Sequence, residues 1–95
     1  MAAGKVVVAR KLSGLLALEW GYDFKPDMVF IDGGHDYTTV ALDIAIAYSL
    51  LVPGGLLCGH DFSNDWPGVQ QAVRELVPDY QRVPGGDIWF KEMPR

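Results

Sequence analysis

The sequence predicts an α/β fold with a mostly parallel sheet, in a single domain over residues 1–95. Two observations lead to this prediction. Apolar, partly β-branched runs alternate along the chain with segments of helical character, in the order βαβαβαββ. In addition, 95 residues with 49% hydrophobic and 21% charged side chains suit one small globular domain.

The first half of the chain predicts two strands and a short helix. The β-branched run at 5–9 is typical of a strand buried in a parallel sheet. Ser13 can cap a helix over 13–19, which a glycine then stops. A second apolar strand over 27–32 ends at a pair of glycines, which predicts a turn.

The second half predicts two helices, at 38–51 and 67–77, and three strands, at 56–60, 80–83 and 88–91. Asp36 is a good N-cap for the first of these helices, and a Pro-Gly-Gly sequence ends it. Pro67 opens the second helix, which has apolar side chains on one side only. The last two strands flank a Pro-Gly-Gly-Asp turn and predict a terminal hairpin.

The helix at 38–51 is apolar on nearly every side. Four polar residues are expected to meet water, namely Thr38, Thr39, Asp43 and Ser49. A helix on the surface of a small domain normally shows a broad polar face. Ninety-five residues offer little to cover a second apolar face, so we expect a homo-oligomer in which a partner chain covers it.

Composition excludes several classes of partner. The net charge of −4 and the pI near 4.8 argue against nucleic acid and against an anionic membrane. No apolar run approaches the length of a membrane span or a signal peptide, so we expect a cytoplasmic protein. Cys58 is the only cysteine, and its apolar strand favours a small buried hydrophobe over a reactive thiol.

Four polar side chains follow two of the predicted strands. Asp32 and His35 follow the strand at 27–32, and His60 and Asp61 end the strand at 56–60. A right-handed crossover between parallel strands places their carboxyl ends at one edge of the sheet, where α/β proteins bind ligands. We therefore expect these side chains on one rim, with the two carboxylates roughly 5–8 Å apart.

Each of these residues also has a purely structural interpretation. Asp32 and Asp61 could cap the loops after their strands, and His35 could bond to the backbone of its glycine turn. His60 is interpreted as a strand-end histidine that bonds to a loop carbonyl. Three aromatic residues are assigned to the core or to an interface rather than to a substrate clamp: Trp66, Trp89 and Phe90.

Three segments, DMVFIDGGHDY, LLVPGGLLCGHDF and DWPGVQQAV, resemble the C-terminal half of class I S-adenosylmethionine-dependent methyltransferases. They are most similar to the metal-dependent O-methyltransferases of small molecules. The similarity runs from Asp27 to Val77, and the terminal hairpin fits the family's last two strands. The resemblance implies methyl transfer from S-adenosylmethionine to an oxygen of a small molecule.

The resemblance also implies roles for three residues. Asp32 and Asp61 correspond to carboxylates that hold Mg²⁺ where the family uses a metal. His35 occupies the place of the basic residue that takes the proton of the acceptor hydroxyl. The chemistry is consistent, because a hard divalent cation takes oxygen ligands and acidifies a bound hydroxyl. An imidazole can accept a proton near neutral pH.

The family builds its donor site mainly from its first two strands, with a glycine-rich loop after the first. This chain opens at what resembles the third strand and contains no G-x-G-x-x-G. We therefore expect a truncated, Rossmann-like domain. The strand at 5–9 should then lie beside 27–32 or pair with another chain, and the uncovered edge of 27–32 could recruit a partner.

Three functions stay open on the sequence. The first is an active or partner-completed methyltransferase, whose donor-site residues come from another polypeptide. The second is a non-catalytic oligomeric module, a gene fragment that retains half of the fold. The third is a small metal-binding or hydrolytic protein that uses the four polar residues of the rim.

Overall fold

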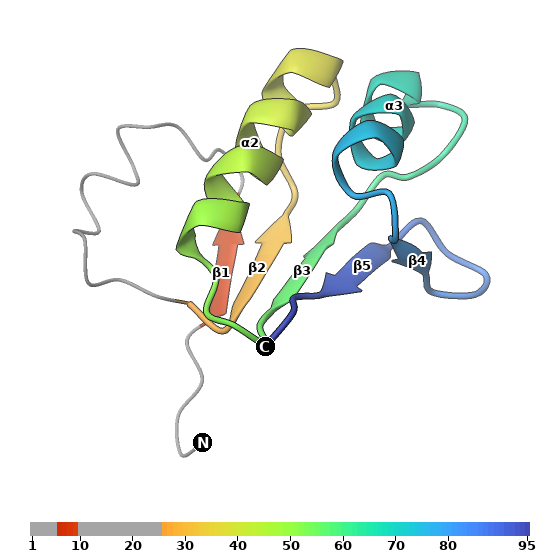
Figure 1. The fold of residues 1–95 in the computed structure, drawn as a ribbon. Helices are drawn as coiled ribbons and strands as arrows, with labels where there is room; N and C mark the ends of the chain where they lie inside the picture. Colours follow the sequence, from red (N-terminus) through yellow and green to blue (C-terminus); the bar gives the residue numbers. More distant parts are fainter. Residues whose placement is uncertain (1–5, 10–25) are drawn as a thin grey trace.

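The computed structural model describes residues 6–9 and 26–95. Its strands are β1 (Val6–Ala9), β2 (Met28–Ile31), β3 (Leu56–Gly59), β4 (Gln81–Arg82) and β5 (Trp89–Glu92), and its helices are α2 (Tyr37–Leu50) and α3 (Pro67–Leu76) (Figure 1). Each element begins and ends within one residue of its predicted bounds. The helix predicted at 13–19 lies outside the described residues.

The five strands form one sheet in the order β1-β2-β3-β5-β4. β1, β2 and β3 run parallel to one another, whereas β5 is antiparallel to both β3 and β4. The sheet is therefore mixed, and the expectation of a mostly parallel sheet is wrong. The physical reason is the terminal hairpin, whose connection is too short for a parallel crossover, so its strands pair antiparallel.

β1 lies directly beside β2, with Val6 opposite Met28 and Ala9 opposite Ile31. This confirms one of the two placements expected for the first strand. It also corrects part of the argument for an oligomer, because the edge of β2 is already paired within the chain. Whatever the assembly of the protein, an open edge on β2 does not drive it.

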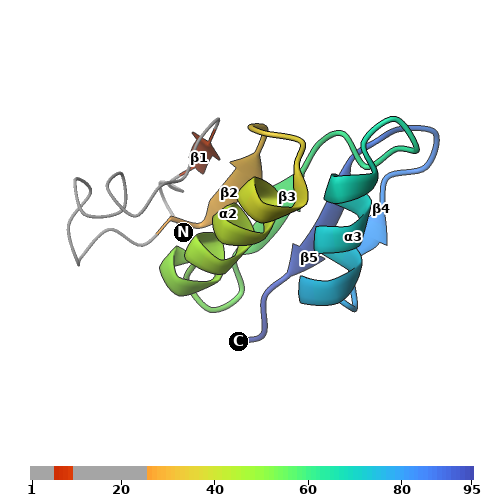
Figure 2. The ribbon, with the colours of Figure 1, turned by 90° about the horizontal axis from the view of Figure 1, so that it is seen from above.

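Both helices within the described ranges lie on the same face of the sheet (Figure 2). Val29, Ile31, Leu57 and Trp89 point from the strands into the core that these helices cover, and all four are buried. Alternation along a strand sends the intervening residues to the opposite face. The sheet thus has one face packed by helices.

The opposite face carries a row of side chains in register across three strands. Phe30 on β2 pairs with Cys58 on β3, which pairs with Phe90 on β5. The two phenylalanines are half-buried, and Cys58 is buried between the neighbouring strands. Burial raises the pKa of the Cys58 thiol to about 11, which agrees with its interpretation as a buried hydrophobe.

Helix α2 begins as the sequence predicts, because the Asp36 carboxylate accepts a hydrogen bond of 3.0 Å from the Thr39 backbone N–H. One expectation for this helix is wrong: Asp43 does not meet water but is 1% exposed. Leu42 is the most exposed large hydrophobic side chain of this helix, at 52%. Neither described helix is long and apolar enough to cross a membrane.

Candidate functional site

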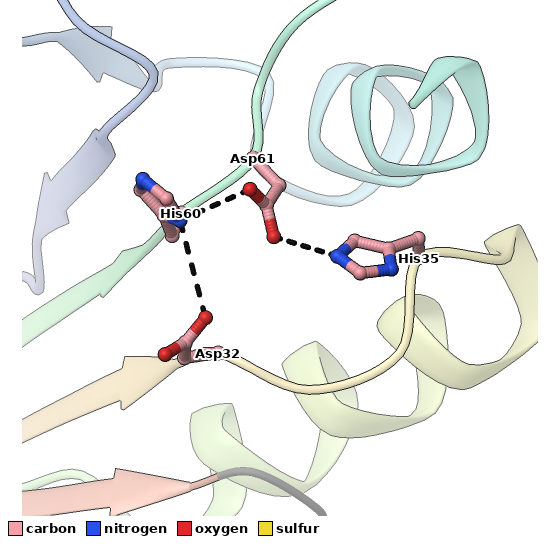
Figure 3. Close-up of polar contacts among 4 residues, drawn as sticks. All are labelled: Asp32, His35, His60 and Asp61. Carbon is pink, nitrogen blue, oxygen red and sulfur yellow. Dashed lines mark hydrogen bonds and ion pairs between the residues drawn. The ribbon is translucent and has the colours of Figure 1, made fainter. Parts of the chain in front are cut away.

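The rim where β2 and β3 end brings the four predicted polar residues together (Figure 3). Ile31 and Gly59, the last residues of the two strands, are directly opposite each other. The His60 N–H continues this pairing by donating to the Ile31 carbonyl, at 3.2 Å. Asp32 and His60 therefore leave the sheet side by side. The prediction that these two strands are neighbours is confirmed.

Asp61 occupies the centre of the group. Its Oδ2 lies 2.7 Å from His35 Nε2, and its Oδ1 lies 3.0 Å from His60 Nδ1. His60 Nδ1 also lies 3.9 Å from Asp32 Oδ1. One carboxylate thus contacts both histidines, and His60 stands between the two carboxylates.

The backbone of Asp61 explains how it reaches both histidines. Its φ of 63° lies in the left-handed region, which a residue with a side chain seldom adopts. The next residue, Phe62, is buried, and its N–H donates to the Asp87 carbonyl at 3.0 Å. This anchor in the core fixes the sharp turn, and the turn keeps the Asp61 side chain on the rim beside that of His60.

His35 comes from the loop between β2 and α2, and α3 supports it. The Trp66 ring stacks on the His35 imidazole, with centroids 3.8 Å apart and planes inclined by 16°. Gly68, in the first turn of α3, lies so close to the loop that an added Cβ would be 2.8 Å from the His35 carbonyl oxygen. Trp66 and Gly68 thus set the position of the loop and the plane of the imidazole.

The hydrogen bond between His35 and Asp61 determines which nitrogen of His35 can act as a base. An ionised carboxylate can only accept hydrogen bonds, so His35 Nε2 is the donor. In the neutral imidazole the lone pair then resides on Nδ1. The pair is partly accessible, with His35 and Asp61 side chains 37% and 20% exposed, so a small molecule can approach it.

Three residues of the rim could hold a metal ion. Asp32, His60 and Asp61 each offer one ligand atom, and these atoms all lie within 4.8 Å of one another. Two carboxylate oxygens and an imidazole nitrogen are donors that divalent cations accept. The donor set therefore fits a divalent ion, although it is not the all-oxygen set typical of Mg²⁺.

The structure corrects the contacts expected of two residues of this site, His60, which was expected on the rim, and Trp66. His60 was expected to bond to a loop carbonyl, whereas its ring faces the two carboxylates. Trp66 was assigned to the core or an interface, yet it is 40% exposed and stacks on His35. Its place just after β3 and at the start of α3, on the same rim as the strand ends, was the available signal. Trp89, by contrast, is in the core as expected.

A comparison with protein-family models places residues 5–62, more than half of the chain, in a family described as a methyltransferase domain. The chain belongs to this methyltransferase family. The matched segment contains all four polar residues of the rim. A search of curated proteins gave no significant match.

Proposed function

We propose that this protein takes part in S-adenosylmethionine-dependent methyl transfer to a hydroxyl group of a small molecule. Family membership supports the methyltransferase part of this proposal. The observation that carries the rest is the 2.7 Å contact between His35 and Asp61 on the carboxyl rim of the parallel strands. An acid–base pair there can remove the proton that an oxygen acceptor must lose.

The residues of the chain have distinct tasks in this reaction. S-adenosylmethionine, when bound, supplies an electrophilic methyl group on a sulfonium sulfur. His35 accepts the proton of the acceptor hydroxyl at Nδ1 as the oxygen bonds to the methyl carbon and the carbon–sulfur bond breaks. Asp61 holds the imidazole in the required tautomer and stabilises the imidazolium. Trp66 keeps the ring plane fixed by stacking.

A metal ion would be held by Asp32, Asp61 and His60. When bound, a divalent cation lowers the pKa of a coordinated hydroxyl. Asp61 contacts the two histidines through different oxygens, His60 through Oδ1 and His35 through Oδ2. The ion would therefore lie on the side of Asp61 that faces away from His35. The ion and the base would therefore act from different sides of Asp61.

The 95 residues carry mainly the acceptor side of the proposed site. The chain contains no G-x-G-x-x-G, and glycine-rich loops are what allow a backbone to approach a nucleotide closely. We propose that these residues supply the acceptor side of the site and, lacking such a loop, bind S-adenosylmethionine weakly.

The test is production of S-adenosylhomocysteine from millimolar S-adenosylmethionine, with catechol as a probe acceptor and a divalent ion present. We expect acceptor-dependent turnover that His35→Gln lowers by about 10²–10⁴-fold, because a general base contributes about that much. Asp79→Asn, an exposed carboxylate that pairs with Lys91 instead, is the matched control and should retain the rate. Turnover that is absent, or equal in both variants, would refute the proposal.

A second candidate is a non-catalytic homo-oligomeric module. It draws support from the sheet face opposite the helices, where Phe30 and Phe90 are half-buried and parallel strands usually need a cover. Light scattering should then give about twice the 10.5 kDa chain mass. Phe90→Glu should yield monomers, and Leu42→Glu on the outer side of α2 should not. A monomeric mass for the unmodified chain would exclude this candidate.

A further inference from the structure

We infer that the cation site on the rim is selective for a divalent transition metal such as Mn²⁺ or Zn²⁺ over Mg²⁺, because His60 supplies an imidazole nitrogen as its third ligand. The inference rests on the proposed function only in treating the rim as the place where an ion acts. It depends on three features of the rim: the position of His60, the second contact of Asp61, and the chemistry of the donors.

His60 lies close enough to Asp32 and Asp61 to bind the same ion as these two carboxylates. Its Nδ1 is 3.0 Å from Asp61 Oδ1 and 3.9 Å from Asp32 Oδ1. Atoms bound about 2.1 Å from one ion are roughly 3.0–4.2 Å apart in the usual geometries. The largest spacing in the group, within 4.8 Å, therefore needs only a small contraction. The side chains of His60 and Asp32 are 45% and 41% exposed, so they have room to move this small distance.

Consecutive residues of a strand normally point to opposite faces of the sheet. His60 and Asp61 are consecutive, yet both side chains meet at the same point on the rim (Figure 3). The left-handed backbone of Asp61 makes this arrangement possible. A cation here would therefore find an imidazole beside a carboxylate from the same strand end, with Asp32 completing the group from β2.

The other oxygen of Asp61 is already engaged. His35 Nε2 binds Oδ2 at 2.7 Å, which leaves Oδ1 directed toward His60 and Asp32. A hydrogen bond to the outer oxygen of a ligating carboxylate is the usual way in which proteins orient such a ligand. His35 is thus an orienting residue for the ion, and His60 is a ligand.

The chemistry of the donors decides which ions are preferred. Mg²⁺ takes oxygen ligands in near-octahedral geometry and keeps much of its water, so an imidazole ligand adds little to the affinity of the site for Mg²⁺. Mn²⁺, Zn²⁺ and related ions accept imidazole nitrogen together with carboxylate oxygen. Asp32 and Asp61 alone would suit Mg²⁺. His60 shifts the preference toward transition metals.

Calorimetric titration of the purified chain with MnCl₂, ZnCl₂ and MgCl₂, without S-adenosylmethionine, tests the inference. We expect Mn²⁺ and Zn²⁺ to bind at least about tenfold more tightly than Mg²⁺. His60→Asn replaces the imidazole by an amide oxygen and should lower the affinity for these two ions about 10-fold or more, while Mg²⁺ binding stays the same or improves. Asp79→Asn is the control, since it changes an exposed carboxylate that pairs with Lys91 and should leave all three affinities unchanged.

A spectroscopic readout identifies the ligand directly. Electron spin-echo modulation of the Mn²⁺-loaded chain should show a directly bound ¹⁴N nucleus in the unmodified protein and in His35→Gln, but not in His60→Asn. Equal affinity for Mg²⁺, or Mn²⁺ bound without nitrogen coupling, would overturn the inference. The outcome is separable from methyl transfer: equal affinities for Mg²⁺ and Mn²⁺ with turnover present would refute the metal selectivity alone, and nitrogen-coupled Mn²⁺ without turnover would refute the enzyme alone.

Discussion

Replacement of Gly68 by alanine should destabilise the protein and disturb the site together. Gly68 lies in the first turn of α3, where the helix touches the loop that carries His35. An added Cβ would lie 2.7 Å from the Tyr37 nitrogen, 2.8 Å from the His35 carbonyl oxygen and 3.1 Å from the Asp36 carbonyl carbon. All three are backbone atoms, so no side chain can turn aside to make room.

The size of the effect follows from these distances. Ordinary carbon contacts begin near 3.4 Å, so the helix and the loop must separate by about 0.7 Å, which is 3.4 − 2.7. Overpacking of this kind costs about 1–3 kcal/mol of unfolding free energy. Alanine in a helix otherwise gains up to about 1 kcal/mol over glycine. We expect a net loss of about 1 kcal/mol, which lowers the Tm of a domain of this size by roughly 4–8 °C.

Thermal unfolding by circular dichroism measures this loss, and two-dimensional NMR of the His35 imidazole measures the displacement in the site. Gly86→Ala is the matched control, because no atom lies within 4 Å of its added Cβ. The reasoning would be refuted if Gly68→Ala left the Tm at the level of this control or raised it. The steric overlap would then cost no stability, and the change in Tm would reflect the higher helix propensity of alanine alone.

Three further predictions concern single residues. Asp36→Ala should lower the Tm by roughly 4–8 °C, whereas Asp36→Asn should retain most of the cap. The hydrogen bond from the Thr39 N–H holds the pKa of Asp36 below its ordinary 3.8. The stabilising effect of the Asp36 carboxylate should therefore be present above pH 3.8 and be lost as the pH falls through the pKa of Asp36 in the folded protein. Thermal melts from pH 7 to pH 2 that show the same pH dependence for the unmodified protein and for Asp36→Asn would contradict this. The Cys58 thiol, whose pKa burial raises to about 11, should react with a disulfide reagent at pH 8 only slowly in the folded protein and fast in urea. Trp66→Leu should lower kcat more than it changes KM, with recovery in Trp66→Phe, because the stacked ring positions His35; equal loss in both variants would argue against stacking.

The elements of the fold could be predicted from local signals. The cap at Asp36, the proline at the start of α3 and the apolar runs each act within a few residues, and the structure confirms them. The strand directions could not all be predicted in this way. The terminal hairpin was predicted, but its local signals did not indicate that β5 lies between β3 and β4 and pairs antiparallel with both, which makes the sheet mixed.

The site was predictable where it follows from topology and was missed where it follows from a single backbone angle. Asp32 and Asp61 end neighbouring parallel strands, so their approach follows from the crossover. The contact between His60 and the Asp61 carboxylate depends on the left-handed φ of Asp61. No feature of the local sequence predicts this backbone angle. The burial of Asp43 likewise depends on how α2 is packed, which periodicity did not indicate.

Binding of S-adenosylmethionine to this chain tests the central claim most directly. Saturation-transfer difference NMR detects weak ligands, and it suits residues that include no G-x-G-x-x-G loop. With diamagnetic Zn²⁺ present, we expect transfer to the sulfonium methyl protons that Asp61→Asn weakens and Asp79→Asn does not. No transfer at millimolar S-adenosylmethionine, with or without a divalent ion, or equal transfer in both variants, would contradict the assignment of Asp61 and His35 to a methyl-transfer site.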